Sequence, residues 1–181
     1  MIMTPRARKA ALVVHVVASV GWLGAAAAFL ALAVVGLASP DERVVRAAYP
    51  AMGLVTGYVI VPAALATLAT GVVQSLGTRW GLFRHYWVVI KLVVTTVAAL
   101  VLLQQLGPIA DLADAALDGT VSRPPMRSMR ASMVLHSAGG IVVLLVPTAL
   151  SVVKPPGLTR YGRRRQAQRR GAPDDSPALV P

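Results

Sequence analysis

The chain has 181 residues, of which 56% are hydrophobic and only 14% are charged, and its mean hydropathy is +0.66. Soluble domains carry about 25% charged residues, so this composition excludes a soluble globular enzyme and indicates a chain that lies mostly in a bilayer. The sequence contains no cysteine, which excludes disulfides and thiolate metal sites.

Four apolar segments are each long enough to cross, as a helix, a hydrocarbon core that needs about 20 residues. They cover approximately residues 10–38, 51–77, 85–106 and 131–153. The first follows basic residues as a secretory signal would, but it far exceeds the usual 7–15 apolar residues of a signal, so we expect a retained helix. The sequence therefore predicts an all-α four-helix transmembrane bundle over residues 1–155. Residues 156–181 are predicted to form a basic, disordered tail.

Lysine and arginine are distributed unequally between the two ends of these spans. The stretch before the first span, the loop after the second and the tail hold twelve, whereas the other side holds five. Basic loops are retained in the cytoplasm, so both termini are predicted to be cytoplasmic. The tail holds six arginines and two aspartates and so contributes +4 of the net charge of +11. We expect it to contact anionic lipid headgroups rather than nucleic acid.

Two ionisable side chains lie inside the predicted spans at similar depth. His15 is five residues beyond the start of the first span and Lys91 is six beyond the start of the third. At about 1.5 Å of rise per residue, both lie roughly 7–9 Å from the cytoplasmic end. Trp22 shares a helical face with His15, and Trp87 precedes Lys91 by one turn. Because charge is costly at this depth, these four residues are candidates for a cofactor site.

The chemistry of these residues leaves several interpretations open. His15 and Lys91 are close enough in predicted depth to be the two axial ligands of one haem iron, and His15 alone is a suitable proximal ligand. His136 is predicted near the opposite surface, about 15 Å away in depth, so it cannot share that iron. Alternatively, His15 is a neutral hydrogen-bonding residue between helices, and Lys91 extends its amine toward the headgroups. Thr67, Thr70 and Gln74 are expected to link helices.

The spacings His15-x6-Trp22 and Trp87-x3-Lys91 resemble those of a superfamily of small bacterial membrane proteins. It includes the copper resistance protein D type, the HemJ-type protoporphyrinogen oxidase and uncharacterised four-helix integral membrane proteins, and this chain is most similar to the last group. The resemblance implies a bundle in the bacterial cytoplasmic (inner) membrane. In the oxidase branch it implies b-type haem with an essential histidine and lysine, at the positions of His15 and Lys91. The oxidase pattern has charged residues after the first tryptophan, where this chain has glycine and alanine at 24–28.

A second group of candidate ligands lies on the predicted outer side. Met126, Met129, Met133 and His136 share one helical face if the fourth helix starts before residue 131. Thioether and imidazole groups suit Cu(I), although methionine is also an ordinary apolar filler. The sequence thus favours a multi-pass membrane protein with a haem-linked redox role. The alternative is a non-enzymatic component that handles copper or docks to membrane partners or to a second copy of itself.

Overall fold

The computed structural model describes residues 3–77, 81–153, 155 and 157–170. Within this part of the chain the regular structure is entirely helical. The elements are α1 (Pro5–Ala38), α2 (Glu42–Val55), the π-helical turn η1 (Thr56–Ile60), α3 (Val61–Gly77), α4 (Tyr86–Gln104), α5 (Leu106–Leu117), the 3-10 turn η2 (Pro124–Met126), α6 (Arg127–Val153) and α7 (Arg160–Arg170).

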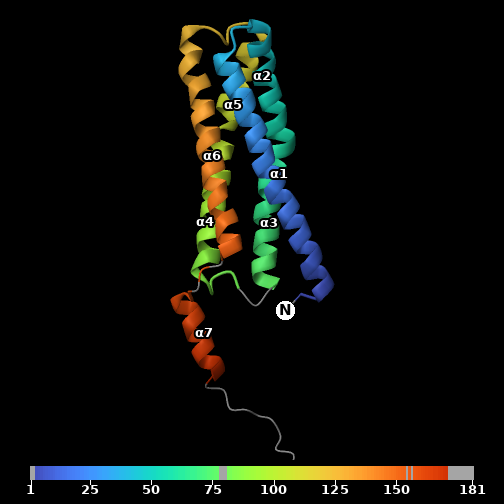
Figure 1. Cartoon of the computed structure of the whole chain (residues 1–181), viewed down its shortest axis with the longest axis vertical. Coiled ribbons are helices and arrows are strands. Elements are labelled where there is room, and N and C mark those ends of the chain that lie inside the picture. Colours follow the sequence, from blue (N-terminus) through green and yellow to red (C-terminus); the bar gives the residue numbers. More distant parts are fainter. Residues whose placement is uncertain (1–2, 78–80, 154, 156, 171–181) are drawn as a thin grey trace, which may run out of the picture.

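These elements join into four long apolar rods that lie side by side (Figure 1). Each is long and apolar enough to cross a membrane: Pro5–Ala38, Glu42–Gly77, Tyr86–Leu117 and Pro124–Val153. Between 11% and 28% of the most apolar stretch of each rod is buried in the bundle, and the other apolar side chains face outward, as they do in a protein surrounded by lipid. The predicted four-helix bundle and the membrane-protein class are confirmed.

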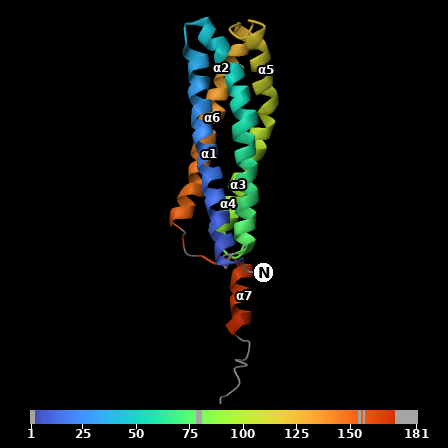
Figure 2. The same cartoon turned by 90° about the vertical axis from the view of Figure 1, so that its right-hand side faces the viewer.

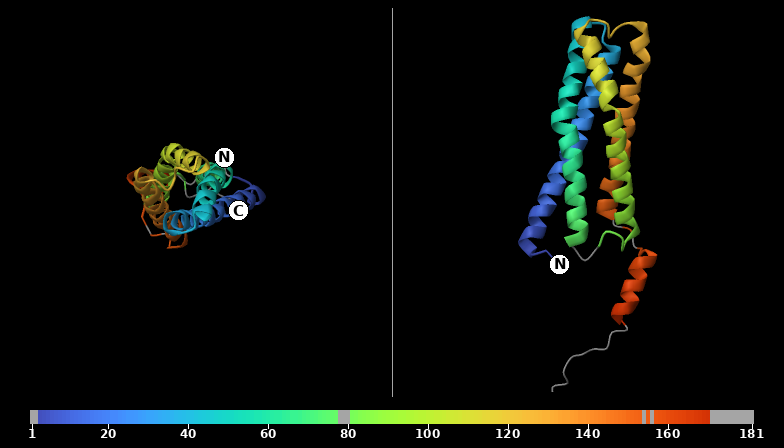
Figure 3. Two further views of the ribbon diagram at one scale, coloured as in Figure 1. Left: turned by 90° about the horizontal axis from the view of Figure 1, so that it is seen from above. Right: turned by 180° about the vertical axis from the view of Figure 1, so that it is seen from behind.

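The chain enters and leaves the bundle at the same end (Figures 1 and 3). We call this end, where α1 and α4 begin and α3 and α6 finish, the near end. The opposite end, formed by the turns at 39–41 and 118–123, is the far end. Because the chain crosses the membrane an even number of times, its two ends lie on the same side. The bundle alone does not decide which side is cytoplasmic.

The helices extend beyond the predicted spans at the far end. Helix α2 begins at Glu42, where Asp41 caps it by accepting a hydrogen bond from the Arg43 amide at 2.9 Å. Helix α5 continues the third rod to Leu117. These two helices lie against each other (Figure 2), and each contributes only one apolar face to the core. A search for uniformly apolar segments misses such amphipathic helices, because their polar face lowers the average hydropathy.

The most deeply buried side chains gather at the far end. Tyr49, Met52, Leu112, Val121 and Met133 are each less than 2% exposed. They belong to α2, α5, α6 and the turn between α5 and η2. The best-packed part of the core therefore lies between the far-end segments of these helices.

Arg46 and Arg130 lie outside the predicted spans, but in the structure both cap helices at the far end. Arg130 is buried, and its guanidinium donates to the carbonyls of Gly36 and Leu37 at the last turn of α1 and to the Tyr49 hydroxyl. Arg46 donates to the carbonyls of Ala116 and Leu117 at the end of α5. Terminal helix carbonyls have no partner within their own helix, so these arginines supply the missing donors.

The prediction of a disordered tail from residue 156 differs from the structure over its first part. Thr159 bonds to the loop before α4, since its amide donates to the Arg84 carbonyl at 3.0 Å and its hydroxyl to the Phe83 carbonyl at 2.5 Å. The same hydroxyl accepts a bond from the Gly162 amide and caps α7. The residues of α7 are mostly arginine and glutamine, which are good helix formers. The high charge of this segment nevertheless favours a prediction of disorder. Residues 171–181 lie outside the described residues.

Candidate functional site

His15 is half-buried on α1 and faces α3. Its Nδ1 atom lies 3.0 Å from the Thr70 hydroxyl oxygen. Its ring packs over Gly71, where an added Cβ would lie only 3.2 Å from His15 Cε1. A glycine at this position therefore allows the imidazole to approach the backbone of α3.

The hydrogen bonds of Thr70 decide which ring nitrogen of His15 carries the proton. The Thr70 hydroxyl has one hydrogen, which it donates within its own helix to the Ala66 carbonyl at 2.5 Å. Its oxygen must then accept from Nδ1–H of His15. The proton is therefore assigned to Nδ1, and Nε2 keeps its lone pair. Metal-bound histidines are commonly oriented in this way by a bond from their second nitrogen.

Two other polar residues lie on the same face of α3. Gln74 donates from Nε2 to the Ala11 carbonyl of α1 at 2.9 Å, so the predicted linking role is confirmed for Thr70 and Gln74. Thr67 is buried, but its hydroxyl has no hydrogen-bond partner in the part of the chain that is described. A buried hydroxyl without a partner is uncommon, and this one lies on the face of α3 that His15 contacts.

Lys91 makes a separate polar contact between α4 and α6. Its Nζ donates to the Ser151 hydroxyl at 2.6 Å, and Ser151 in turn donates to the Pro147 carbonyl at 2.7 Å. The ammonium also lies 5.9 Å from the centre of the Trp87 ring, within the range of a cation–π interaction. The fold thus provides the partners that a charged side chain at this depth requires.

The four predicted cofactor residues are divided among three places. His15 contacts α3, Lys91 lies beside Trp87 and contacts α6, and Trp22 is buried at one end of a cavity farther along α1. Helix α3 lies between the near-end parts of α1 and α4 (Figures 1 and 3). Sequence reasoning missed Ser151, because a serine four residues after a helical proline is common and carries no distinctive signal.

The second group of predicted ligands is partly brought together at the far half. Met129, Met133 and His136 line a hollow of about 340 Å³. Met126 does not line this hollow, although it packs against the core as Met129 does. His136 Nδ1 lies 2.8 Å from the Ser132 carbonyl and 2.9 Å from the Ser132 hydroxyl. Because a carbonyl can only accept, we assign the proton to Nδ1. The described residues contain no cluster of three or more histidine and carboxylate side chains placed to hold a metal.

Comparison of the chain with protein-family models, with curated proteins and with solved structures finds no match. The class of this protein is therefore inferred from its fold and its polar contacts alone. It is a four-helix integral membrane protein with half-buried histidine and lysine side chains between its helices.

Proposed function

We propose that this membrane protein binds b-type haem in the near half of the bundle, with His15 as an axial ligand and a redox-linked role. The observation that carries the proposal is the bond between His15 Nδ1 and Thr70. It holds the imidazole against α3 and leaves Nε2 as the coordinating atom. A bound haem would supply one-electron chemistry at its iron.

The remaining residues of the near half suit this group in two ways. Thr67 offers a buried hydroxyl without a partner, on the same face of α3 as Thr70. Lys91, together with Ser151, offers a cation for a propionate, or a second ligand if the amine leaves the serine. His15 alone suffices for a five-coordinate iron, so the proposal does not require His15 and Lys91 to meet.

The absorption spectrum of the detergent-purified protein, oxidised and dithionite-reduced, tests this proposal. We expect a Soret band with reducible α and β bands, which His15→Ala abolishes. His136→Ala is the matched control, because it removes a histidine from the other half of the bundle and should leave the spectrum unchanged. A colourless protein after expression with added haem precursor contradicts the proposal, as does a spectrum that survives His15→Ala.

We further propose that the near end faces the cytoplasm. The basic residues of the N-terminal stretch, the loop before α4 and the tail support this orientation, and α7 carries arginines that anionic headgroups attract. Reporter fusions at residue 181 and within the turn at 39–41 test it. A cytoplasmic reporter should be active only at 181, and the reverse pattern contradicts the orientation.

A second candidate function, copper handling, is supported by the hollow that Met129, Met133 and His136 share. Purified protein should then compete with a chromogenic chelator for Cu(I), and Met129→Leu should weaken that competition. Met126→Leu is the control, since Met126 lies outside the hollow. Equal competition by both variants, or none by the unaltered protein, contradicts this candidate.

A further inference from the structure

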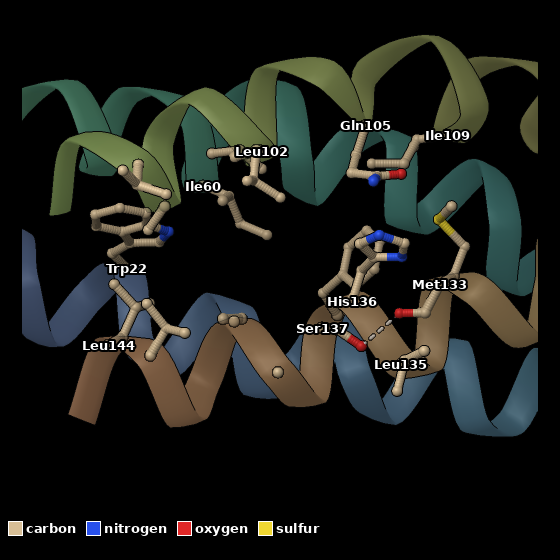
Figure 4. Close-up of a pocket in the computed structure, with 18 residues that line it drawn as sticks. Trp22, Ile60, Leu102, Gln105, Ile109, Met133, Leu135, His136, Ser137 and Leu144 are labelled. Atoms are coloured by element: carbon tan, nitrogen blue, oxygen red, sulfur yellow. Dashed lines mark hydrogen bonds between the residues drawn. The ribbon is translucent and has the colours of Figure 1, made fainter. Parts of the chain in front are cut away.

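The far half of the bundle contains a half-open cavity of about 390 Å³ between α1, η1, α4, α5 and α6 (Figure 4). This volume lies in the range of about 300–1,000 Å³ that is typical of small-molecule sites. Trp22 lies at one end, and Gln105 and His136 lie at the other, with Ile60 and Leu102 between them. The cavity is therefore elongated, with an apolar body, the Trp22 indole at one end and the side chains of Gln105 and His136 at the other.

None of the described residues that line this cavity is a lysine, arginine, aspartate or glutamate. Among these lining residues Ser137 carries a hydroxyl, and its proton is already donated to the Met133 carbonyl at 2.7 Å. A phosphate or a carboxylate would find no counter-charge here, and burying an unpaired charge is very costly. The cavity thus favours a neutral molecule that is mostly apolar.

Gln105 and His136, at the end of the cavity opposite Trp22, have unused hydrogen-bonding atoms. His136 uses Nδ1–H on the Ser132 carbonyl, so Nε2 can only accept. Neither this Nε2 atom nor the side-chain amide of Gln105 has a hydrogen-bond partner among the described residues. An amide both donates and accepts. This end of the cavity therefore matches an O–H group, which donates to Nε2 and accepts from the side-chain amide of Gln105.

The cavity opens on the side of the bundle that faces the bilayer. Val101 and Leu135, on opposite walls, are both exposed on the outer surface of the bundle, and His136 itself is exposed. A polar side chain in contact with hydrocarbon is unfavourable, and a bound hydroxyl would satisfy it. A molecule dissolved in the membrane can therefore reach the site without crossing water.

From this geometry we propose that the far-half cavity binds a neutral, lipid-soluble alcohol, phenol or quinol, with its hydroxyl between His136 and Gln105 and its apolar body extending toward Trp22. This site is separate from the proposed haem site and does not depend on it. It shares Met133 and His136 with the copper candidate but not Met129, which lines only the neighbouring hollow.

Binding of 4-heptylphenol to the full-length protein in nanodiscs, followed by native mass spectrometry, tests the proposal. The matched probe is its methyl ether, which has the same apolar body but no O–H. We expect saturable binding of the phenol and about tenfold weaker binding of the ether, the factor that corresponds to one hydrogen bond. His136→Leu should reduce the difference between the two probes to less than twofold.

Two neighbouring valines of α6 provide a steric control. Val143 lines the cavity, whereas Val142 does not and is exposed. Val143→Trp should abolish binding and Val142→Trp should leave it unchanged. Absence of saturable binding, equal binding of phenol and ether, or equal binding by both tryptophan variants overturns the proposal. His15→Ala should leave phenol binding unchanged, so failure of this site and failure of the haem site are distinguishable.

Discussion

His15 and Lys91 in the near half differ from Gln105 and His136 in the far half in how their side chains are paired. In the near half, His15 and Lys91 each bond to a hydroxyl of a neighbouring helix. In the far half, Gln105 and the Nε2 atom of His136 face a cavity without such partners. Hydrogen bonds between transmembrane helices contribute modestly, about 0.6 kcal/mol on average. The near-half bonds therefore position side chains more than they hold the fold, and the unpaired atoms of the far half indicate binding.

Stability comes instead from the packed core at the far end, where Arg130 joins α1, α2 and α6. Arg130→Met should give the largest loss, about 3 kcal/mol of unfolding free energy, because charged hydrogen bonds contribute about 1.5–3 kcal/mol each. The Tyr49 hydroxyl and the last carbonyls of α1 lose their donor. Unfolding in mixed detergent, followed by circular dichroism, measures this. The exposed Arg127→Met is the control, and equal loss in both variants contradicts the capping role.

The next largest effect tests the packing beside that arginine. A Cβ on Gly36 would lie 2.9 Å from Cζ of the Tyr49 ring, which is buried and held by Arg130. Gly36→Ala should therefore cost about 2 kcal/mol, as expected for overpacking a tight core. Gly24→Ala is the control, because nothing lies within 4 Å of its added Cβ. If both variants unfold at the same detergent fraction, the far end is less tightly packed than described.

A smaller effect, of opposite sign, tests the open space of the far half. Gly140 lines the cavity, and an added Cβ there meets nothing within 4 Å. Gly140→Ala should raise the unfolding free energy by about 0.5–1 kcal/mol, the helix preference of alanine over glycine. Gly21→Ala has equal space but lies outside the cavity and should give the same gain. A loss specific to Gly140→Ala would show that the cavity collapses.

The smallest effect separates contacts between helices from contacts within one helix in the near half. Thr70→Val removes the acceptor of His15 and should cost about 0.6 kcal/mol. It should also broaden or shift the bands of the proposed haem, because the imidazole loses its orienting bond. Thr148 donates only to the Leu144 carbonyl of its own helix, so Thr148→Val should change neither quantity. Identical spectra for the two variants contradict the role of Thr70 as an orienting residue.

Sequence reasoning reached individual residues unevenly, for reasons that are physical. The predicted depth of His15 and Lys91 in the membrane indicates that both side chains need hydrogen-bond partners, and both have them. Trp22 is predicted to lie with His15 because the two share a helical face. One face of a long helix contacts different neighbours along its length, however, and Trp22 lines the far-half cavity. Gln105 was not selected, because a glutamine at the predicted end of a span looks like an ordinary boundary residue.

The sequence by itself determined the class of the protein and the number of its membrane-crossing rods, since apolar length and composition depend on the chain alone. Only the tertiary structure decided which polar atoms are paired, because the partners of Lys91 and Arg130 are, respectively, 60 and 94 residues away in sequence. The cavity is likewise a property of the bundle. It exists because side chains from separate helices leave a space between them, and no single segment of the sequence records that space.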